Sequence, residues 1–330
     1  MSVLVCGGAG YVGSHTVREL IKEKEDVLVI DNLQTGHVES VSRHATFYQG
    51  DIRDKNFLGK IFMKHKIESV LHFAASSLVA ESMNRPLDYF NNNVYGLQIL
   101  LECMLAANVD KLVFSSTCAV YGTPEQLPIS EANTTNPENC YGETKLVMEK
   151  MMQWVALAHN IRYVSLRYFN AAGASDDASI GEDHSPETHL IPLILQIPLG
   201  KRSFLNVFGD DYDTFDGTCI RDYVHVTDLA DAHVKALGYL RNGNTSNIFN
   251  LGSGKGYSVK EIIHIAEKIT KVNIPLVIDK RRAGDAAKLV ATIDKAKELL
   301  KWQPLYSMED IMKTAWYWHK ANPDGFYLVE

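Results

Sequence analysis

The chain has 330 residues, of which 46% are hydrophobic and 22% charged, a composition typical of a globular protein long enough for two domains. Its net charge is −7 with scattered Lys and Arg, which argues against a nucleic-acid surface, and no apolar stretch approaches the roughly 20 residues of a membrane helix. The five cysteines form no C-x-x-C pair and a strand starts at residue 2, so we expect a cytoplasmic protein without signal peptide, membrane contact or disulfide framework.

The first thirty-one residues predict a dinucleotide-binding unit. In order they form a strand, a glycine turn, a helix and a second strand, over residues 2–6, 7–13, 14–24 and 27–30. Gly7, Gly10 and Gly13 let the turn approach a pyrophosphate, which the helix N-terminus faces with free N–H groups. Asp31 is placed to accept hydrogen bonds from an adenosine ribose. Because the neighbouring Asn32 brings no cation for a 2′-phosphate, NAD is favoured over NADP.

Strands and helices continue to alternate after this unit. The expected strands cover residues 46–48, 69–73, 111–117 and 162–166, and the expected helices cover residues 55–66, 87–108 and 141–159. This alternation implies right-handed crossovers and a doubly wound parallel α/β sheet of the Rossmann type. We expect an NAD-binding domain at 1–170 and a smaller, mixed α/β substrate-binding domain at 171–330. A segment of about 220–251, with a helix at 227–240 and a strand at 247–251, returns to the first domain.

Polar and small residues follow the strands at the edge where a cofactor would lie. Asp51 follows the third strand and is expected to contact the adenine amine, although a turn or N-cap role explains it nearly as well. Ala74 and Ala75 follow the fourth strand and permit a cofactor to approach closely. The asparagine run at residues 91–93 is unusual inside a helix and is available to polar ligand groups.

Tyr141, Lys145 and Thr117 form the predicted catalytic group. Tyr141 and Lys145 are four residues apart and therefore share one helix face. An ammonium beside the phenol favours the phenolate, so the tyrosine pKa is expected to fall from about 10 and to suit a general base. Thr117 ends the fifth strand at the same sheet edge and is expected to share a hydrogen bond with a substrate hydroxyl. The three residues predict an oxidoreductase site.

Three further patterns give only weak evidence for a phosphate or metal site. Residues 252–256 form a second glycine turn between a strand and a helix, but its third glycine is misplaced and Ser258 is interpreted as a helix N-cap. A calcium loop at residues 211–217 fails because Phe215 stands where an oxygen ligand is required. The twelve histidines contain no H-E-x-x-H motif, so no metal site is expected.

The glycine turn and the Thr, Tyr-x-x-x-Lys group resemble the extended short-chain dehydrogenase/reductase superfamily. Nearly the whole chain resembles the UDP-glucose (UDP-galactose) 4-epimerases of that superfamily. The motifs that carry this resemblance include V-C-G-G-A-G-Y-V-G-S-H-T at 5–16, G-D-I-R at 50–53, Y-G-E-T-K at 141–145, L-R-Y-F-N at 166–170, R-D-Y-V-H-V at 221–226 and R-R-A-G-D at 281–285.

The resemblance implies inversion at C4 of a UDP-hexose, which interconverts UDP-galactose and UDP-glucose in galactose metabolism. Tyr141, assisted by Thr117 and held near Lys145, takes the proton of the 4-OH. A hydride passes from C4 to a retained NAD. The resulting 4-ketose turns within the site and receives the hydride on its other face.

The same resemblance implies the ligand contacts. Besides the glycines and acids already named, the cofactor is expected to contact Tyr11, Val12, Asn32, Ile52, Phe73, Ala74, Ala75, Asn92, Ser115, Lys145, Tyr168 and Phe169. The UDP-sugar is expected to contact Thr117, Tyr141, Asn170, Leu190, Arg221, Tyr223, Arg282, Asp285 and Leu289. Among these, Arg221, Arg282 and Asn170 hold the pyrophosphate and Asp285 holds the uridine ribose. At His189 some members carry an Asn that contacts substrate, so the role of His189 stays open.

Several alternatives follow from the same motifs. A nucleotide-sugar 4,6-dehydratase needs an acid pair directly after Thr117, and the chain has none there. A UDP-N-acetylhexosamine or UDP-pentose 4-epimerase stays open because Leu289 is intermediate between the bulky and small residues that set the pocket size. A non-catalytic NAD-binding regulator is expected to lose Tyr141 or Lys145, and both are present.

Family members commonly dimerise through the helices that follow the fourth and fifth strands. We therefore expect a homodimer with a four-helix bundle. The apolar residues expected in it are Leu97, Leu101, Met104, Met148, Met151, Met152 and Val155.

Overall fold

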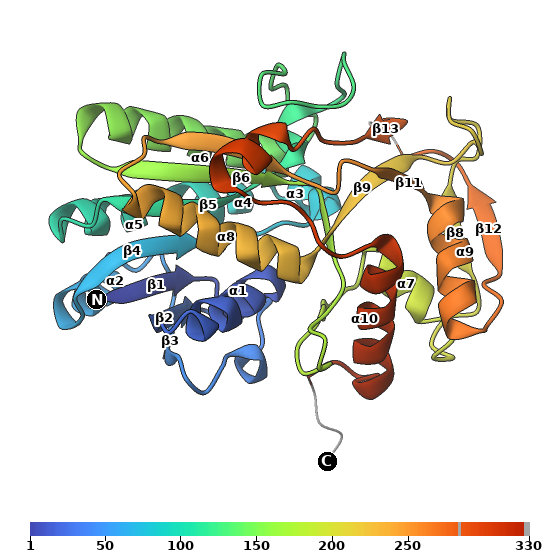
Figure 1. Ribbon diagram of the computed structural model, residues 1–330, viewed down its shortest axis with the longest axis horizontal. Helices are drawn as coiled ribbons and strands as arrows, with labels where there is room; N and C mark the ends of the chain where they lie inside the picture. The colour runs from blue at the N-terminus through green and yellow to red at the C-terminus, as the bar shows by residue number, and fades with distance from the viewer. Residues whose placement is uncertain (283–284, 327–330) are drawn as a thin grey trace.

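Seven parallel strands form the centre of the larger lobe (Figure 1). In the computed structural model, which describes residues 1–282 and 285–326, their order is β10-β6-β5-β4-β1-β2-β3. The strands are β1 (Ser2–Cys6), β2 (Asp26–Asp31), β3 (Thr46–Gln49), β4 (Ile67–His72), β5 (Lys111–Thr117), β6 (Arg162–Tyr168) and β10 (Asn247–Leu251). Every pairing in this sheet is parallel, which confirms the predicted doubly wound α/β fold. The strand order reverses between β1 and β4, and ligands bind at such a switch point.

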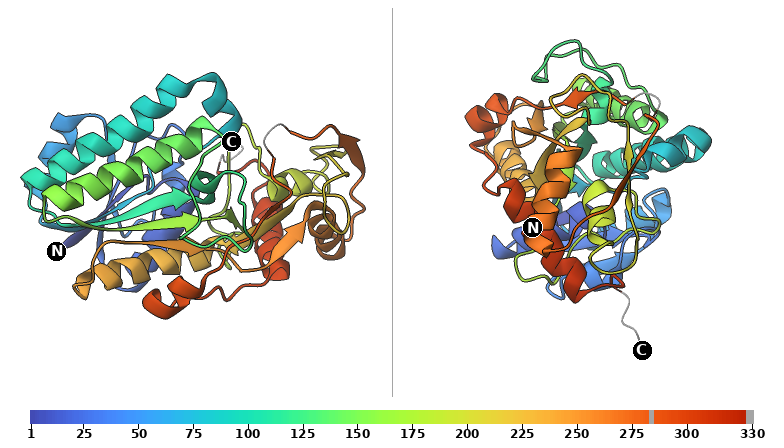
Figure 2. Two further views of the ribbon diagram at one scale, coloured as in Figure 1. Left: turned by 90° about the horizontal axis from the view of Figure 1, so that it is seen from above. Right: turned by 90° about the vertical axis from the view of Figure 1, so that its right-hand side faces the viewer.

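Helices cover both faces of this sheet, as Figures 1 and 2 show. One face carries α1 (Tyr11–Lys22) and α8 (Val226–Arg241), and the other carries α2 (Lys55–Lys64), α5 (Gly96–Ala106) and α6 (Cys140–Ala158). Val3 and Val5 of β1 pack into the first core, whereas Leu4 and Cys6 pack into the second. Because both faces are buried, the strand is apolar without alternation. Among the described residues, no helix has both the length and the apolar character needed to cross a membrane.

The helix expected over residues 87–108 is divided into three parts. The three parts are α4 (Pro86–Tyr89), the π turn η2 (Phe90–Tyr95) and α5, and the short helix α3 (Val79–Asn84) precedes them. Asn93 lies fully buried within the π turn, where it accepts from the Ser76 backbone N–H at 2.8 Å and donates to Thr144 Oγ1 at 3.0 Å. Asn93 therefore ties this helix to α6 and is engaged within the protein.

The apolar residues expected in a dimer bundle lie mostly inside the protomer. Five of the seven are buried in the core beneath α5 and α6: Leu97, Leu101, Met104, Met148 and Met152. Their assignment to a subunit interface was wrong because the helical periodicity that identifies an apolar face does not say what covers it. The outward side of α6 instead exposes Trp154 and Leu157, at 71% and 72%.

The smaller lobe has its own sheets and its own core. One sheet contains β7 (Asn170–Ala172), β9 (Ile220–His225), β11 (Gly256–Ser258) and β13 (Lys288–Leu289), and the other contains β8 (Leu205–Phe208) and β12 (Leu276–Asp279). The helices are α7 (Leu190–Leu195), α9 (Val259–Thr270) and α10 (Met308–Ala321). Short turns η1 (Val38–Ser40), η3 (Cys118–Tyr121) and η4 (Ala296–Leu300) lie elsewhere. Strand β11 pairs antiparallel with β9 and the other pairs are parallel, which gives this lobe mixed sheets.

We propose the domain division 1–170 and 171–330, with a returning segment of about 220–251 whose first strand, β9, pairs within the smaller lobe. In the returning segment β10 pairs with β6, and α8 packs beside α1. Trp302, well beyond that segment, is also fully buried in the core of the larger lobe, and its Nε1 donates to the Asp228 carbonyl at 2.8 Å. The chain therefore crosses to the larger lobe a second time near residue 300.

Candidate active site

The glycine turn lies between β1 and α1 and is packed against the end of β4. Gly7 has a φ of +82°, and a Cβ there would lie 2.4 Å from the Ala74 backbone nitrogen. A Cβ on Gly13 would lie 2.1 Å from the Gly7 carbonyl oxygen. At Gly10 the nearest atom would be 3.5 Å away. Gly7 and Gly13 are therefore required by the packing of the turn itself, whereas the surface at Gly10 is open.

The start of α1 has the features of an anion site. Gly10 is its N-cap residue and no side chain caps the helix. The first N–H groups of a helix have no acceptor within it, so those of Tyr11 and Val12 are available to an anion. The Tyr11 hydroxyl donates to the Gly173 carbonyl at 2.5 Å, so its side chain is engaged within the protein. A dinucleotide pyrophosphate fits this uncapped helix start, and the turn therefore fits NAD.

Asp31, the predicted ribose contact, ends β2 and is 8% exposed. Its two carboxylate oxygens accept from the backbone N–H groups of Ala9 and Leu33, at 3.0 and 2.9 Å. Burial raises its pKa, and these two hydrogen bonds oppose that rise. Each oxygen can accept a second donor, so the carboxylate keeps the capacity to bind two ribose hydroxyls.

Asp51, the predicted adenine contact, is held by Arg53. Its Oδ1 accepts from Arg53 Nε at 2.9 Å, and its Oδ2 accepts from Arg53 Nη2 at 2.6 Å and from Asn32 Nδ2 at 3.3 Å. The hydrogen bonds from Arg53 lower the pKa of Asp51 to about 2. The neighbouring Ile52 is buried against the start of α5, where a Cβ on Gly96 would lie 2.8 Å from it. An adenine contact by Asp51 thus has to share the carboxylate with Arg53.

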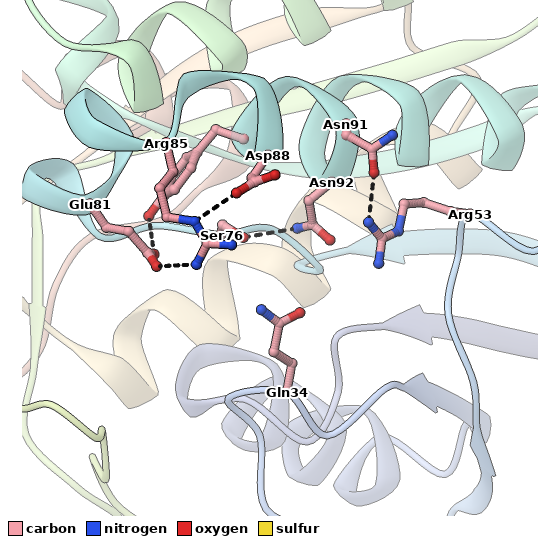
Figure 3. Close-up of a pocket in the computed structure, with 9 residues that line it drawn as sticks. Gln34, Arg53, Ser76, Glu81, Arg85, Asp88, Asn91 and Asn92 are labelled. Carbon is pink, nitrogen blue, oxygen red and sulfur yellow. Dashed lines mark hydrogen bonds and ion pairs between the residues drawn. The ribbon is translucent and has the colours of Figure 1, made fainter.

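A polar pocket opens next to Arg53 (Figure 3). It is lined by Gln34, Arg53, Ser76, Glu81, Arg85, Asp88, Tyr89, Asn91 and Asn92. Asn92 Nδ2 donates to Ser76 Oγ at 3.2 Å, and Arg53 Nη1 donates to Asn91 Oδ1 at 2.7 Å. Gln34 extends from the loop after β2 toward Ser76 and Asn92. The sequence identifies Asn91 and Asn92 as possible ligand contacts and Arg53 as part of the G-D-I-R motif, whereas the other lining residues come from separate segments.

Thr117, Tyr141 and Lys145 lie together at the carboxyl end of β5. The side chain of Asn139 caps α6, which places Tyr141 and Lys145 in its first two turns. The Lys145 ammonium lies 5.9 Å from the centre of the Tyr141 ring and donates to the Ser115 carbonyl at 2.7 Å. A hydrogen bond joins Tyr141 to Thr117, which is 8% exposed. A phenol, a hydroxyl and an amine therefore converge where the parallel strands end.

The expected lowering of the Tyr141 pKa is not observed. Burial raises the pKa of Tyr141 well above its usual value, although the hydrogen bond with Thr117 opposes this. Burial also lowers the pKa of Lys145 to about 7, despite the attraction of Glu149. The prediction was wrong on this point because it counted the lysine charge and not the desolvation that both groups share.

Other predicted cofactor residues follow the same sheet edge. Ser115 Oγ and the Tyr168 hydroxyl form a hydrogen bond of 2.5 Å across β5 and β6. Phe169 follows β6 and is 6% exposed. Three partly exposed residues follow the end of β4: Phe73, Ala74 and Ala75. The segments after β4, β5 and β6 therefore lie along one continuous edge of the seven-stranded sheet, at the carboxyl ends of its strands.

The predicted UDP-sugar residues come together from three separate segments of the smaller lobe. Asn170 of β7 pairs with Tyr223 of β9 in parallel register, and Leu289 of β13 pairs with Arg221 of β9. Arg221 Nη2 lies 2.9 Å from Asp285 Oδ1, so two predicted ligand contacts form an ion pair with each other. This assembly gives one cation, one carboxylate and one amide within a single sheet region.

Two other predicted contacts flank this sheet. The guanidinium of Arg282 lies 3.9 Å from the centre of the Phe208 ring, which is a cation–π contact. Leu190 is the first residue of α7 and is half-buried. Residues 283 and 284 of the R-R-A-G-D motif lie outside the described residues.

The second glycine turn, at residues 252–256, binds a carboxylate of the protein itself. Asp222 accepts from the backbone N–H groups of Ser253 at 2.7 Å, Gly254 at 3.1 Å and Ala291 at 3.1 Å. Ser258 is the N-cap of α9, as predicted, and the reciprocal hydrogen bond of Glu261 completes a capping box. Because Asp222 occupies the N–H groups of the turn, the turn is not free to bind a phosphate.

The chain is similar to known epimerases in both sequence and structure. The model of the "NAD dependent epimerase/dehydratase family" matches residues 3–252. A UDP-glucose 4-epimerase of Lacticaseibacillus casei is 53% identical over 327 residues, which cover 99% of each chain. A crystal structure of a UDP-glucose 4-epimerase superposes with a TM-score of 0.97 at 53% identity and covers 99% of this chain and 100% of that one. The Bifidobacterium longum UDP-glucose 4-epimerase in complex with NAD+ and UDP superposes with a TM-score of 0.94 at 37% identity, covering 99% and 100%.

Proposed function

Because this chain belongs to the NAD-dependent epimerase/dehydratase family, we propose that it inverts C4 of a UDP-hexose and interconverts UDP-galactose and UDP-glucose. The chain is an NAD-dependent enzyme of the UDP-glucose 4-epimerase kind. The observation that carries the proposal is the convergence of Tyr141, Thr117 and Lys145 at the end of β5, beside a glycine turn that fits NAD.

In this proposal the catalytic residues move one proton. Tyr141, in its phenolate form, takes the proton of the 4-OH as the C4–H bond breaks, and returns it when the ketone is reduced on its other face. The positive charge of bound NAD+ would favour that phenolate against the effect of burial. Thr117 shares the hydrogen bond of the phenol and orients the hydroxyl. Lys145, anchored on the Ser115 carbonyl, offers a positive charge near the phenol when it is protonated. When bound, NAD supplies the hydride acceptor that this chemistry needs.

The smaller lobe binds the nucleotide in this proposal. Arg221 and Arg282 face the pyrophosphate as cations, with Asn170 as a polar partner. Asp285 exchanges its ion pair with Arg221 for the uridine ribose, since a carboxylate accepts two hydroxyls. Tyr223, Leu190 and Leu289 border the uridine and the sugar. A firmly bound nucleotide and a loosely bound sugar allow the ketose to rotate within the site, so that its other face meets the cofactor.

We also propose a cytoplasmic homodimer. All five cysteines are free thiols, as expected in a reducing compartment. The exposed Trp154 and Leu157 on the outer side of α6 supply an apolar surface for a second copy. Light scattering at micromolar concentration should give twice the chain mass, and Trp154→Glu should shift it toward the monomer. A monomeric mass for the unmodified protein would count against the dimer.

Turnover without added cofactor tests the proposed activity. Purified protein is incubated with UDP-galactose and no added NAD, and UDP-glucose formation is followed; UDP-N-acetylgalactosamine and a UDP-pentose are then compared. We expect turnover of UDP-galactose, since a retained NAD is regenerated in every cycle. Absence of turnover with every sugar, even after NAD is supplied, would contradict the proposal. A rate that favours the N-acetylated or pentose substrate would instead redefine the sugar accepted by the Leu289 pocket.

A further inference from the structure

Four potential metal ligands lie close together in the loop before α7. They are Glu182, His184, Glu187 and His189, and one ligand atom from each lies within 4.8 Å of all the others. Glu182 and Glu187 are almost fully buried, with side chains 5% and 9% exposed. The sequence contains no H-E-x-x-H motif and therefore predicted no metal site. The E-x-H-x-x-E-x-H pattern over residues 182–189 was the signal that could have found this cluster.

Several separations between the candidate ligand atoms are close to those around a tetrahedral ion. His184 Nδ1 lies 3.4 Å from Glu182 Oε1 and 3.7 Å from Glu187 Oε2. His189 Nδ1 lies 2.7 Å from Glu182 Oε1 and 3.4 Å from Glu187 Oε1. Zinc bonds to nitrogen and oxygen of about 2.0–2.2 Å give ligand-to-ligand distances of about 3.3–3.6 Å in a tetrahedron. Three of the four distances are already close to this range.

His184 supplies a second, independent observation. Its Nδ1 atom is buried and makes no hydrogen bond. A buried polar atom that makes no hydrogen bond is costly, so such atoms often mark the place of a ligand. The nearest oxygens, at 3.4 and 3.7 Å, are too distant for a good hydrogen bond but suit two ligands of one metal ion.

The charges of the loop also favour a cation. Among the described residues, the ion pairs of Glu182 and Glu187 are with these two histidines only, and no Lys or Arg pairs with either. Two buried carboxylates need a compensating positive charge. Either both imidazoles are protonated, or two neutral imidazoles and the carboxylates share one divalent cation. His189 is 49% exposed on its side chain, which gives an ion a path into the cluster.

We propose that Glu182, His184, Glu187 and His189 bind one divalent transition-metal ion, with zinc as the best match to two nitrogen and two oxygen donors. Four protein ligands leave no open position, which is typical of a structural site. The ion would connect the loop to two parts of the molecule. The His184 ring lies 6.3 Å from the ring of Tyr11 in the glycine turn, and His189 is the N-cap residue of α7. The ion would therefore stabilise a loop that lies between the glycine turn on the cofactor side and α7 on the substrate side.

Metal content and affinity test this proposal. Untagged protein, prepared with its cofactor, is dialysed against a chelator and then titrated with zinc chloride by calorimetry. Bound zinc is counted by mass spectrometry after desalting. We expect about one tightly bound zinc per chain, and a loss of about 100-fold or more in affinity in the double variant His184→Asn/His189→Asn. The matched control His44→Asn/His264→Asn, which changes two exposed histidines elsewhere, should retain the zinc.

Substitution with cobalt reports the coordination geometry of the site. Co²⁺ in place of zinc should give the intense visible bands of a tetrahedral site, and these should disappear in His189→Asn while the circular dichroism stays unchanged. The proposal is overturned if the unmodified protein retains no zinc, or if the double variant and the control retain equal amounts; the four residues then form an ion-pair cluster only. Zinc is counted without any turnover, so failure of the epimerase assay would leave this result unaffected.

Discussion

The catalytic side and the nucleotide-binding side of the candidate site differ in how their ionisable groups are stabilised. At the carboxyl ends of β4, β5 and β6, burial drives Tyr141 and Lys145 toward their neutral forms. On the smaller lobe, oppositely charged groups pair with one another, as Arg221 does with Asp285. A site that moves a proton needs groups whose charge can change, whereas a site that holds a pyrophosphate needs fixed cations. One pocket can therefore combine a neutral catalytic side with a charged binding side.

Tyr141→Phe should have the largest effect and separates the two sides most sharply. Removal of the phenol hydroxyl is expected to lower kcat about 10³-fold, because the general base is lost while binding is kept. NAD content and UDP affinity should be unchanged. Turnover, cofactor absorbance and UDP calorimetry measure the three quantities, and Tyr317→Phe on an exposed helix surface is the control. Near-normal turnover would remove Tyr141 from the catalytic role.

Gly13→Ala tests the cofactor side by packing alone. The added Cβ would lie 2.1 Å from the Gly7 carbonyl, so we expect a loss of about 2–4 kcal/mol in the free energy of unfolding together with loss of NAD. In α2, a Cβ on Gly59 would meet nothing within 4 Å. Gly59→Ala should therefore stabilise the protein by about 0.5–1 kcal/mol. Denaturant unfolding compares the two, and equal stabilities would show that the turn can relax.

Arg221→Lys tests the binding side. Lysine keeps the charge but loses the planar fork that pairs with a carboxylate or pyrophosphate, so we expect UDP affinity to fall about 10-fold with NAD content unchanged. Calorimetry with UDP measures the effect, and Arg43→Lys, at an exposed position of the larger lobe, is the control. An unchanged UDP affinity would place the pyrophosphate away from Arg221.

The pH dependence of stability tests the neutral side, and its effect on stability is small within any one pH unit. The folded pKa of Lys145 is lowered to about 7 from 10.5, so the unfolded chain binds more protons between pH 7 and 10.5. The free energy of unfolding should therefore rise with pH across this window, by at most about 1.4 kcal/mol per pH unit from this group. Lys145→Met should flatten that rise, as measured by denaturant unfolding at several pH values. The same slope in both proteins would mean that Lys145 stays charged in the folded state.

The sequence by itself determined the parts of the molecule that depend on local pattern. The glycine turn, the parallel strands and the spacing of Tyr141 and Lys145 could all be predicted, because backbone conformation and helical periodicity act over a few residues. The N-cap role of Ser258 was predicted for the same reason, and the structure adds the reciprocal hydrogen bond of Glu261. Boundaries were less accurate: α1 begins at Tyr11 rather than at residue 14.

Only the tertiary structure decided how distant groups share space. The Tyr141 pKa, the burial of Met148, the Arg221–Asp285 pair and the use of the second glycine turn by Asp222 all depend on segments far apart in the chain. The four-residue cluster before α7 is local in sequence, yet its ligand distances depend on how the loop folds. Desolvation and pairing of charges are set by everything that surrounds a group, and a linear pattern contains only its chain neighbours.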